Sequence, residues 1–478
     1  MRLRSIAYGM IAVLAFVLTV LVLRQTFAAS TIQPVLNSPQ PPADASPPES
    51  AEGNGEKMLP YFDDYSWRAF IAMVWPAASG RRGVPDQTQT VASKSQPKVF
   101  ETFKAAWETF RADSQGTFIP GQPAVWGVYE DPQYNACSHK MQYGDLVLAS
   151  FSKFSDMSQA GLGTVDQSIC AGHCGPLMAR NRTFLHYLTG YNEKAFNVVR
   201  QWLFNNPHPT PQGPAYAGIA FPSQQVPGAS PLTVKSAWMD MTGFNASQRE
   251  RYYIRKAWVL DLGGSDSGGP ATCSEKEVGL VGLHIVQRTF DRPQWIWSTF
   301  EQVDNVPPRD PLGSDGSFAL YAPGAPALGA INPYPQIPTH TVSLPFYSVV
   351  RRPQIHPLTY DTNLAYRSKL REAGSVWQYY QLVMTQFPTG IRLSNPDGAN
   401  PKNWYPGAGA DRTSFANVTM ETFHQTGVAV NSCLGCHSHT RVETDFVWSV
   451  FTRPRKKVPG LSMLEMLELK DLLSAQGH

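Results

Sequence analysis

Apolar and polar positions alternate most clearly in the middle of the chain, where β-branched and aromatic runs are separated by Gly, Pro and Asp. These runs predict four strands, at residues 234–241, 252–262, 278–289 and 295–303. Strands that follow one another without long helices between them pair most simply in an antiparallel order. We therefore expect an antiparallel sheet at the centre of the fold.

Apolar residues at helical spacing lie on both sides of this region along the chain. They predict helices at 63–75, 99–110, 179–204 (broken at Gly190) and 364–387, with short strands at 124–129 and 146–151. Residues 304–362 are rich in Pro and Gly and are expected to cover the sheet. Residues 59–410 are therefore predicted to form an α+β body that is antiparallel-sheet-centred and loop-rich.

The C-terminal residues 411–478 carry the clearest chemistry. Cys433-Leu434-Gly435-Cys436-His437 has the C-x-x-C-H spacing of a c-type haem attachment site. Each thiol can form a thioether with one porphyrin vinyl group, and the adjacent imidazole can bind the iron. We predict one covalent haem c on Cys433, Cys436 and His437. A redox C-x-x-C beside an incidental histidine is the alternative.

Predicted helices flank this motif at 417–425 and 462–476, and an apolar run at 446–451 offers a wall for the porphyrin. A helix, a C-x-x-C-H loop and a second helix are the minimum that can wrap a haem. Residues 411–478 are therefore expected to form a small α-helical segment like a cytochrome c.

The first 30 residues indicate export. Arg2 and Arg4 precede nineteen uncharged residues at 5–23, and small residues follow at 28–30. This order is typical of a signal peptide. The uncharged run is also long enough to remain as a membrane anchor. In both cases we expect a periplasmic protein, either soluble or anchored at the inner membrane, and covalent haem attachment belongs in that compartment.

Residues 31–58 separate this export signal from the body. They contain six prolines among Ser, Ala and Glu, which predicts an extended linker.

The balance of charge bears on the partners. Without residues 1–30 the chain has 37 basic and 37 acidic residues. Nucleic-acid binding needs a basic surface, so the neutral balance argues against a nucleic-acid partner. A redox partner protein, and a small-molecule substrate as a further option, agree better with a haem.

The sequence does not name the second axial ligand of the iron. The candidates are Met420 and His424 on one predicted helix, Met463 and Met466 on the last helix, and His284 on the strand 278–289. Met463, Met466 and His284 would equally suit an ordinary core. Closure by Met or His favours electron transfer, whereas an open position permits chemistry on an organic substrate or peroxide. These alternatives stay open.

Four more cysteines predict two disulfides in an oxidising compartment. They are Cys137, Cys170, Cys174 and Cys273. A bond between Cys170 and Cys174 would close a very tight loop, so pairing of these two with Cys137 and Cys273 is favoured. Metal binding by the same cysteines and nearby histidines is the alternative, although their spacing fits no common zinc site.

A further stretch, Ser265-Asp266-Ser267-Gly268-Gly269-Pro270, resembles the nucleophile motif of trypsin-like serine proteases, and residues 171–174 resemble their histidine motif. A triad would need Ser267, His173 and an orienting Asp. No Asp motif lies between the first two, so protease activity is the weakest of the functions considered.

Five stretches together resemble a group of exported bacterial "cytochrome c family" proteins. They are 234–238, 255–258, 281–286, 295–307 and 431–437, within a likeness that spans about residues 60–450. The resemblance implies export and covalent haem on Cys433, Cys436 and His437, but no particular reaction. We expect an exported monohaem c-type cytochrome whose body docks a partner or binds a substrate, with one-electron transfer as its function. A haem-dependent oxidoreductase is the alternative.

Overall fold

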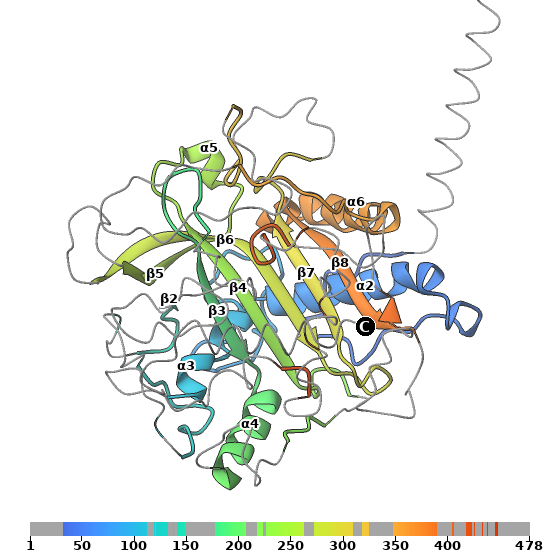
Figure 1. Ribbon diagram of the computed structural model, residues 1–478, viewed down its shortest axis with the longest axis horizontal. Helices are drawn as coiled ribbons and strands as arrows, with labels where there is room; N and C mark the ends of the chain where they lie inside the picture. The colour runs from blue at the N-terminus through green and yellow to red at the C-terminus, as the bar shows by residue number, and fades with distance from the viewer. Residues whose placement is uncertain are drawn as a thin grey trace, which may run out of the picture.

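The computed structural model describes residues 32–111, 119, 121–131, 137, 141–148, 177–206, 218–222, 226–261, 272–308, 318–324, 348–389, 404–405, 417–422, 425, 433, 437 and 445–447. These residues form a mixed α/β structure with few helices around one curled, mainly antiparallel sheet (Figure 1). The predicted α+β class is confirmed at this level. The helical character expected for 411–478 falls largely outside the described residues.

Within the described ranges the sheet has nine strands, in the order β1-β3-β4-β6-β7-β8-β9, with β5 paired to β6 and β2 to β5. The strands are β1 (Lys104–Ala105), β2 (Val147–Leu148), β3 (His186–Tyr191), β4 (Leu232–Asp240), β5 (Ile254–Asp261), β6 (Thr272–Gln287), β7 (Ile296–Gln302), β8 (Tyr380–Pro388) and β9 (Trp404–Tyr405). The β2–β5 pair is parallel and the other pairs are antiparallel. The long β6 pairs with β4 through its second half and with β5 through its first half, which extends the sheet beyond its main body.

Helix α2 (Gly55–Met73) and helix α6 (Pro357–Glu372) cover one face of the sheet, and Figure 1 shows α2 crossing behind β6, β7 and β8. Phe70 of α2 stacks on Phe300 of β7 with ring centroids 4.3 Å apart. Tyr366 of α6 stacks in turn on Trp67 of α2 at 5.0 Å. The other helices in the described ranges are α3 (Ala106–Thr109), α4 (Glu193–Asn205), α5 (Ala246–Arg249) and three 3-10 turns at Glu49–Ala51, Val99–Thr102 and Val376–Tyr379.

Every residue of β7 is buried, because both faces of the sheet are covered there. Side chains alternate between the two faces of a strand. Ser298 bonds Ser66 of α2 at 2.7 Å on the first face. On the other face, Trp297 contacts His437 and Thr299 accepts a hydrogen bond from Asn417. The C-terminal residues therefore form a second layer against the sheet.

The segment predicted as a linker packs against this body instead. Pro41 and Pro42 are buried, and the carbonyl of Pro42 accepts a hydrogen bond from the Gln287 side chain at 2.9 Å. Ile32 and Leu36 pack on the main core. An extended proline-rich chain keeps its carbonyls available as acceptors, so the composition typical of a spacer also suits a strap on a surface. The linker prediction for 31–58 is wrong in this respect, and α2 begins at Gly55 inside that range.

The four central strands are confirmed as β4, β5, β6 and β7, but several flanking elements differ from the prediction. Residues 186–191 and 380–388 are the strands β3 and β8, not helix, and 124–129 lie in turns and irregular chain instead of a strand. Residues 99–110 divide among a 3-10 turn, β1 and α3. Residues 418–422 form turns and a bend in place of the expected helix. A short apolar run buried on both faces has no period that separates strand from helix, which explains the error at β8.

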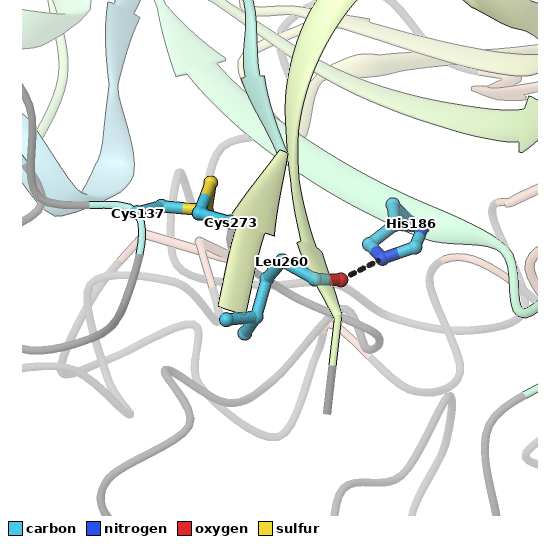
Figure 2. The surroundings of a disulfide bond; sticks show 4 residues. All are labelled: Cys137, His186, Leu260 and Cys273. Atoms are coloured by element: carbon cyan, nitrogen blue, oxygen red, sulfur yellow. Dashed lines mark hydrogen bonds between the residues drawn. A yellow bond between two sulfur atoms is a disulfide. The ribbon is translucent and has the colours of Figure 1, made fainter. Parts of the chain in front are cut away.

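Cys137 and Cys273 form a disulfide, shown in Figure 2. The favoured pairing of these two cysteines with Cys170 and Cys174 is therefore wrong. Cys273 is the second residue of β6 and pairs with Leu260 of β5. Leu260 and Val147 of the neighbouring β2 lie in the same apolar cluster as Cys137. His186 of β3 bonds the Leu260 carbonyl at 2.9 Å, which ties β5 to β3 beside the disulfide.

Several predicted features lie outside the described residues. They are the export segment 1–30, Cys170 and Cys174, and the protease-like residues His173 and Ser267. In the described ranges no helix is long and apolar enough to cross a membrane.

Candidate haem site

Two of the three predicted haem-binding residues, Cys433 and His437, are described by the structure, and both are half-buried. Cys436 lies outside the described residues, as do His424, Met463 and Met466 among the candidate distal ligands. The geometry of the site is therefore built on Cys433, His437 and the sheet face beneath them.

The imidazole of His437 is oriented by a backbone carbonyl. Its Nδ1 lies 2.6 Å from the carbonyl oxygen of Phe446. A carbonyl can only accept, so Nδ1 donates and carries the proton. This tautomer leaves the lone pair on Nε2, the arrangement in which a histidine binds a metal. The His437 ring is thus held in the form that haem iron requires.

An aromatic side chain of β7 lies against this imidazole. The ring centroids of His437 and Trp297 are 4.3 Å apart with the planes tilted by 54°. Trp297 belongs to an apolar cluster with Trp202, Trp295 and Phe446, and Cys433 packs against that cluster. Phe446 and Val447, from the run expected to wall the porphyrin, are buried in it. The residues next to the motif are therefore largely apolar and aromatic.

Cys433 also contacts β8. It packs against the small cluster of Val383 and Met384, both buried. The register of the sheet places Met384 beside Thr299 of β7, and Thr299 beside His284 of β6. His284, Thr299 and Met384 therefore form one row across three strands on the face that carries Cys433 and His437. Neighbouring strands lie about 4.8 Å apart, so this row is about 10 Å long, within the width of a porphyrin.

Residues 417–422 close one side of this face. Asn417 donates to Thr299 Oγ1 at 2.9 Å and to the Phe300 carbonyl at 2.8 Å. The Val418 amide donates to Glu301 at 2.5 Å, and Tyr187 donates to the Thr419 carbonyl at 2.7 Å. Three residues of the C-terminal segment, 417–419, are thus fixed to β3 and β7 before the chain reaches the C-x-x-C-H motif.

A buried ion pair on β7 supports the attachment of residues 417–422 to the sheet. Glu301 is fully buried and pairs with Arg351. Burial raises the pKa of the Glu301 carboxyl, while Arg351 and the Val418 amide lower it. The carboxylate therefore bonds two otherwise distant segments, 348–351 and 417–418.

Two candidates for the second axial ligand, Met420 and His284, are described by the structure and lie in different parts of the fold. Met420 is fully buried in the cluster formed with Tyr187, Ala237 and Val281, apart from the clusters that contact Cys433. His284 lies on the sheet face that carries Cys433 and His437, and its Nε2 is 3.4 Å from Glu421. Neither contact decides the second axial ligand, so both residues remain predictions.

Sequence reasoning did not find Trp297, Met384, Arg288 or Asp445 as parts of the site. Arg288 and Asp445 form a buried ion pair beside Phe446. The available signal for Trp297 was the presence of large apolar side chains at both parities of β7, which predicts packing on both faces of the strand. The pair of Arg288 and Asp445 joins positions 157 apart in sequence, and no local pattern reports such a contact.

Comparisons with family models, with curated proteins and with solved structures found no match for the chain.

Proposed function

We propose that this protein is an exported c-type cytochrome that carries one haem c on Cys433, Cys436 and His437 and transfers single electrons. The observation that carries the proposal is the hydrogen bond from His437 Nδ1 to the Phe446 carbonyl, found at the histidine of a C-x-x-C-H motif. A surface histidine in a chance motif has no need of a buried carbonyl that selects its tautomer.

Each residue has a definite task in this proposal. The sulfur atoms of Cys433 and Cys436 would hold the porphyrin through thioethers, and His437 Nε2 would bind the iron. The Phe446 carbonyl makes the imidazole more basic and fixes its plane. Trp297 and Phe446 exclude water from the proximal side. Haem c supplies a one-electron couple, and the apolar surroundings set its potential.

The setting agrees with an electron carrier of the periplasm. The N-terminal segment has the order of an export signal, and the Cys137–Cys273 disulfide suits an oxidising compartment. The sheet and its two covering layers would then present the haem segment to a redox partner protein. Residues 5–23 would anchor the protein at the inner membrane if they are not removed.

Haem analysis of protein exported from a host that matures c-type cytochromes tests the proposal. A pyridine haemochrome spectrum of the thioether type, with one haem per chain, is the expected result. Cys436→Ala should lose normal covalent attachment of the haem. His437→Ala removes the proposed iron ligand and should lose the visible spectrum of the wild type. His439→Ala is the matched control, since it removes a histidine two residues away and should keep both. Wild-type protein without covalent haem would overturn the proposal.

A haem-dependent oxidoreductase is the second candidate, and the pair of His284 and Glu421 favours it. A histidine 3.4 Å from a carboxylate, on the sheet face next to Cys433, could donate or accept a proton for a bound organic substrate or peroxide. The spectrum separates the two functions. A ferrous form that binds CO rapidly supports the enzyme, whereas a low-spin spectrum indifferent to CO and cyanide supports the electron carrier.

A further inference from the structure

We propose that the buried ion pair of Arg288 and Asp445 positions His437 and thereby tunes the reduction potential of the haem. It does so by holding residues 445 and 446 in a strained turn that directs the Phe446 carbonyl at His437 Nδ1. The inference rests on the proposed function, because it concerns the haem that His437 would bind.

The backbone of this turn is unfavourable for the residues it contains. Asp445 has φ +50° and Phe446 has φ +70°, both in the left-handed region. A bulky residue such as Phe rarely adopts that region, and surrounding contacts must hold it there. In the part of the chain that the structure describes, four non-glycine residues have positive φ. One of the other two is Trp295, which lies in the same apolar cluster as Phe446. Strain of this kind concentrates at functional sites.

Two anchors hold the turn, one on each residue. Nη1 of Arg288 lies 2.6 Å from both carboxylate oxygens of Asp445. The Phe221 amide donates to the same carboxylate at 2.8 Å. The second anchor is the ring of Phe446, which is fully buried between the aromatic side chains.

Arg288 and two tryptophans near the turn come from a single hairpin. Arg288 directly follows β6, Trp295 directly precedes β7, and Trp297 is the second residue of β7. The β6–β7 hairpin therefore holds Asp445 through Arg288, packs Trp295 in the cluster of Phe446 and contacts the His437 ring with Trp297. The position of the Phe446 carbonyl relative to His437 is thus fixed by the sheet. An ion pair that only stabilised the fold would have no need to act on the residue preceding that carbonyl.

The consequence for the haem follows from the proximal hydrogen bond. A strong Nδ1–H···O=C bond makes the imidazole a better donor to iron and favours the ferric state. If the ion pair is broken, residues 445 and 446 can relax toward negative φ and the carbonyl turns away from Nδ1. The hydrogen bond weakens, and the reduction potential rises.

The test uses three variants of the full-length holoprotein. Asp445→Asn removes the charge but tolerates left-handed φ well, so it isolates the ion pair from the backbone preference. Asp445→Ala removes both, and Arg288→Lys keeps the charge without the planar fork. Arg255→Lys is the matched control, because Arg255 makes a similarly buried pair with Glu101 that contacts neither the turn nor His437.

We expect the midpoint potential to rise in the order wild type, Asp445→Asn, Asp445→Ala, with Arg288→Lys also above wild type. The hyperfine-shifted haem-methyl pattern in the NMR spectrum of the ferric protein, which reports the plane of the axial imidazole, should change with the potential. Arg255→Lys should lower stability without moving either readout. Unchanged potential and methyl pattern in folded, haem-loaded Asp445→Ala would overturn the inference.

A further measurement needs no variant and covers the case in which the substitutions prevent folding. In the ferric wild type, the Nδ1 proton of the axial histidine should exchange slowly with D2O, since it is bonded to a buried carbonyl. Rapid exchange would overturn the inference while leaving covalent haem, and so the proposed function, intact. Absence of covalent haem in the wild type would instead reject the proposed function first.

Discussion

Trp297 and His437 lie in contact across the interface between the sheet and the C-terminal segment, with ring centroids 4.3 Å apart. Trp297 is fixed in turn, since its Nε1 donates to the Gln294 carbonyl at 3.1 Å. The indole is therefore a rigid part of the sheet that sets one wall for the imidazole. Residues of the C-x-x-C-H segment thus depend on the central sheet for their surroundings.

Replacing Trp297 should lower stability and, under the proposed function, disturb the surroundings of the haem. Trp297→Ala is expected to lower the free energy of unfolding by about 3–5 kcal/mol, the usual loss for a buried large aromatic residue. It should also shift the Soret band, because water gains access to the proximal side. Urea unfolding and the visible spectrum measure the two effects.

Trp67→Ala is the matched control for this substitution. Trp67 is equally buried but packs between α2 and α6 on the opposite face. It should lose similar stability and keep the spectrum of the wild type. A Soret band that responds equally to both variants would contradict a specific role for Trp297.

The carboxyl of Asp63 makes stability depend on pH. Burial raises its pKa to about 7, although Thr359 and Thr385 donate hydrogen bonds to it. The folded protein therefore keeps this proton up to about pH 7, whereas the unfolded chain releases it near pH 4. Between these values the folded state binds more protons, so the unfolding free energy falls as pH rises.

Asp63→Asn should remove this dependence, since an amide has no proton to release in that range. Relative to the wild type, the variant should gain stability from pH 4 to pH 7, by at most about 4 kcal/mol at 1.36 kcal/mol per pKa unit. Urea titrations at both pH values measure the difference. A difference between the two proteins that is the same at each pH would reject the assignment.

The disulfide should stabilise the fold substantially. It closes a loop between positions 136 apart, and loops of this length are associated with about 4–5 kcal/mol in the chain-entropy account. Cys137→Ala, Cys273→Ala and the double variant should lose the same amount, because each removes one bond. Peptide mapping under non-reducing conditions gives the direct check. A peptide that links Cys137 to Cys170 or Cys174 would contradict the pairing.

How far the sequence predicts this protein depends on the range of each interaction. The strands β4 to β7 were predictable because their β-branched and aromatic runs end at clear turn residues. β8 was not, since residues such as Met384 and Thr385 are buried on both faces and leave no alternation. The C-x-x-C-H motif is local and was visible at once. The support of His437 by Trp297, Phe446 and the Arg288–Asp445 pair arises from tertiary packing that the chain order conceals.

The last prediction concerns Gly282, which lies on β6 beneath residues 417–420. A Cβ at this position would collide with Thr419 Oγ1, whereas Asn417 and Met420 would be at ordinary contact distance. Gly282→Ala should therefore displace the 417–422 segment from the sheet and lower the unfolding free energy by about 1–3 kcal/mol, the range for overpacking.

Thr419→Ala removes the obstructing oxygen, so the double variant should be more stable than the sum of the two single losses predicts. A double-mutant cycle by urea unfolding measures this coupling. Strictly additive losses would show that the glycine is not required for the close approach of Thr419. If the proposed haem is present, the same cycle followed through its visible spectrum would report how strongly the attachment of residues 417–422 to the sheet governs the site at His437.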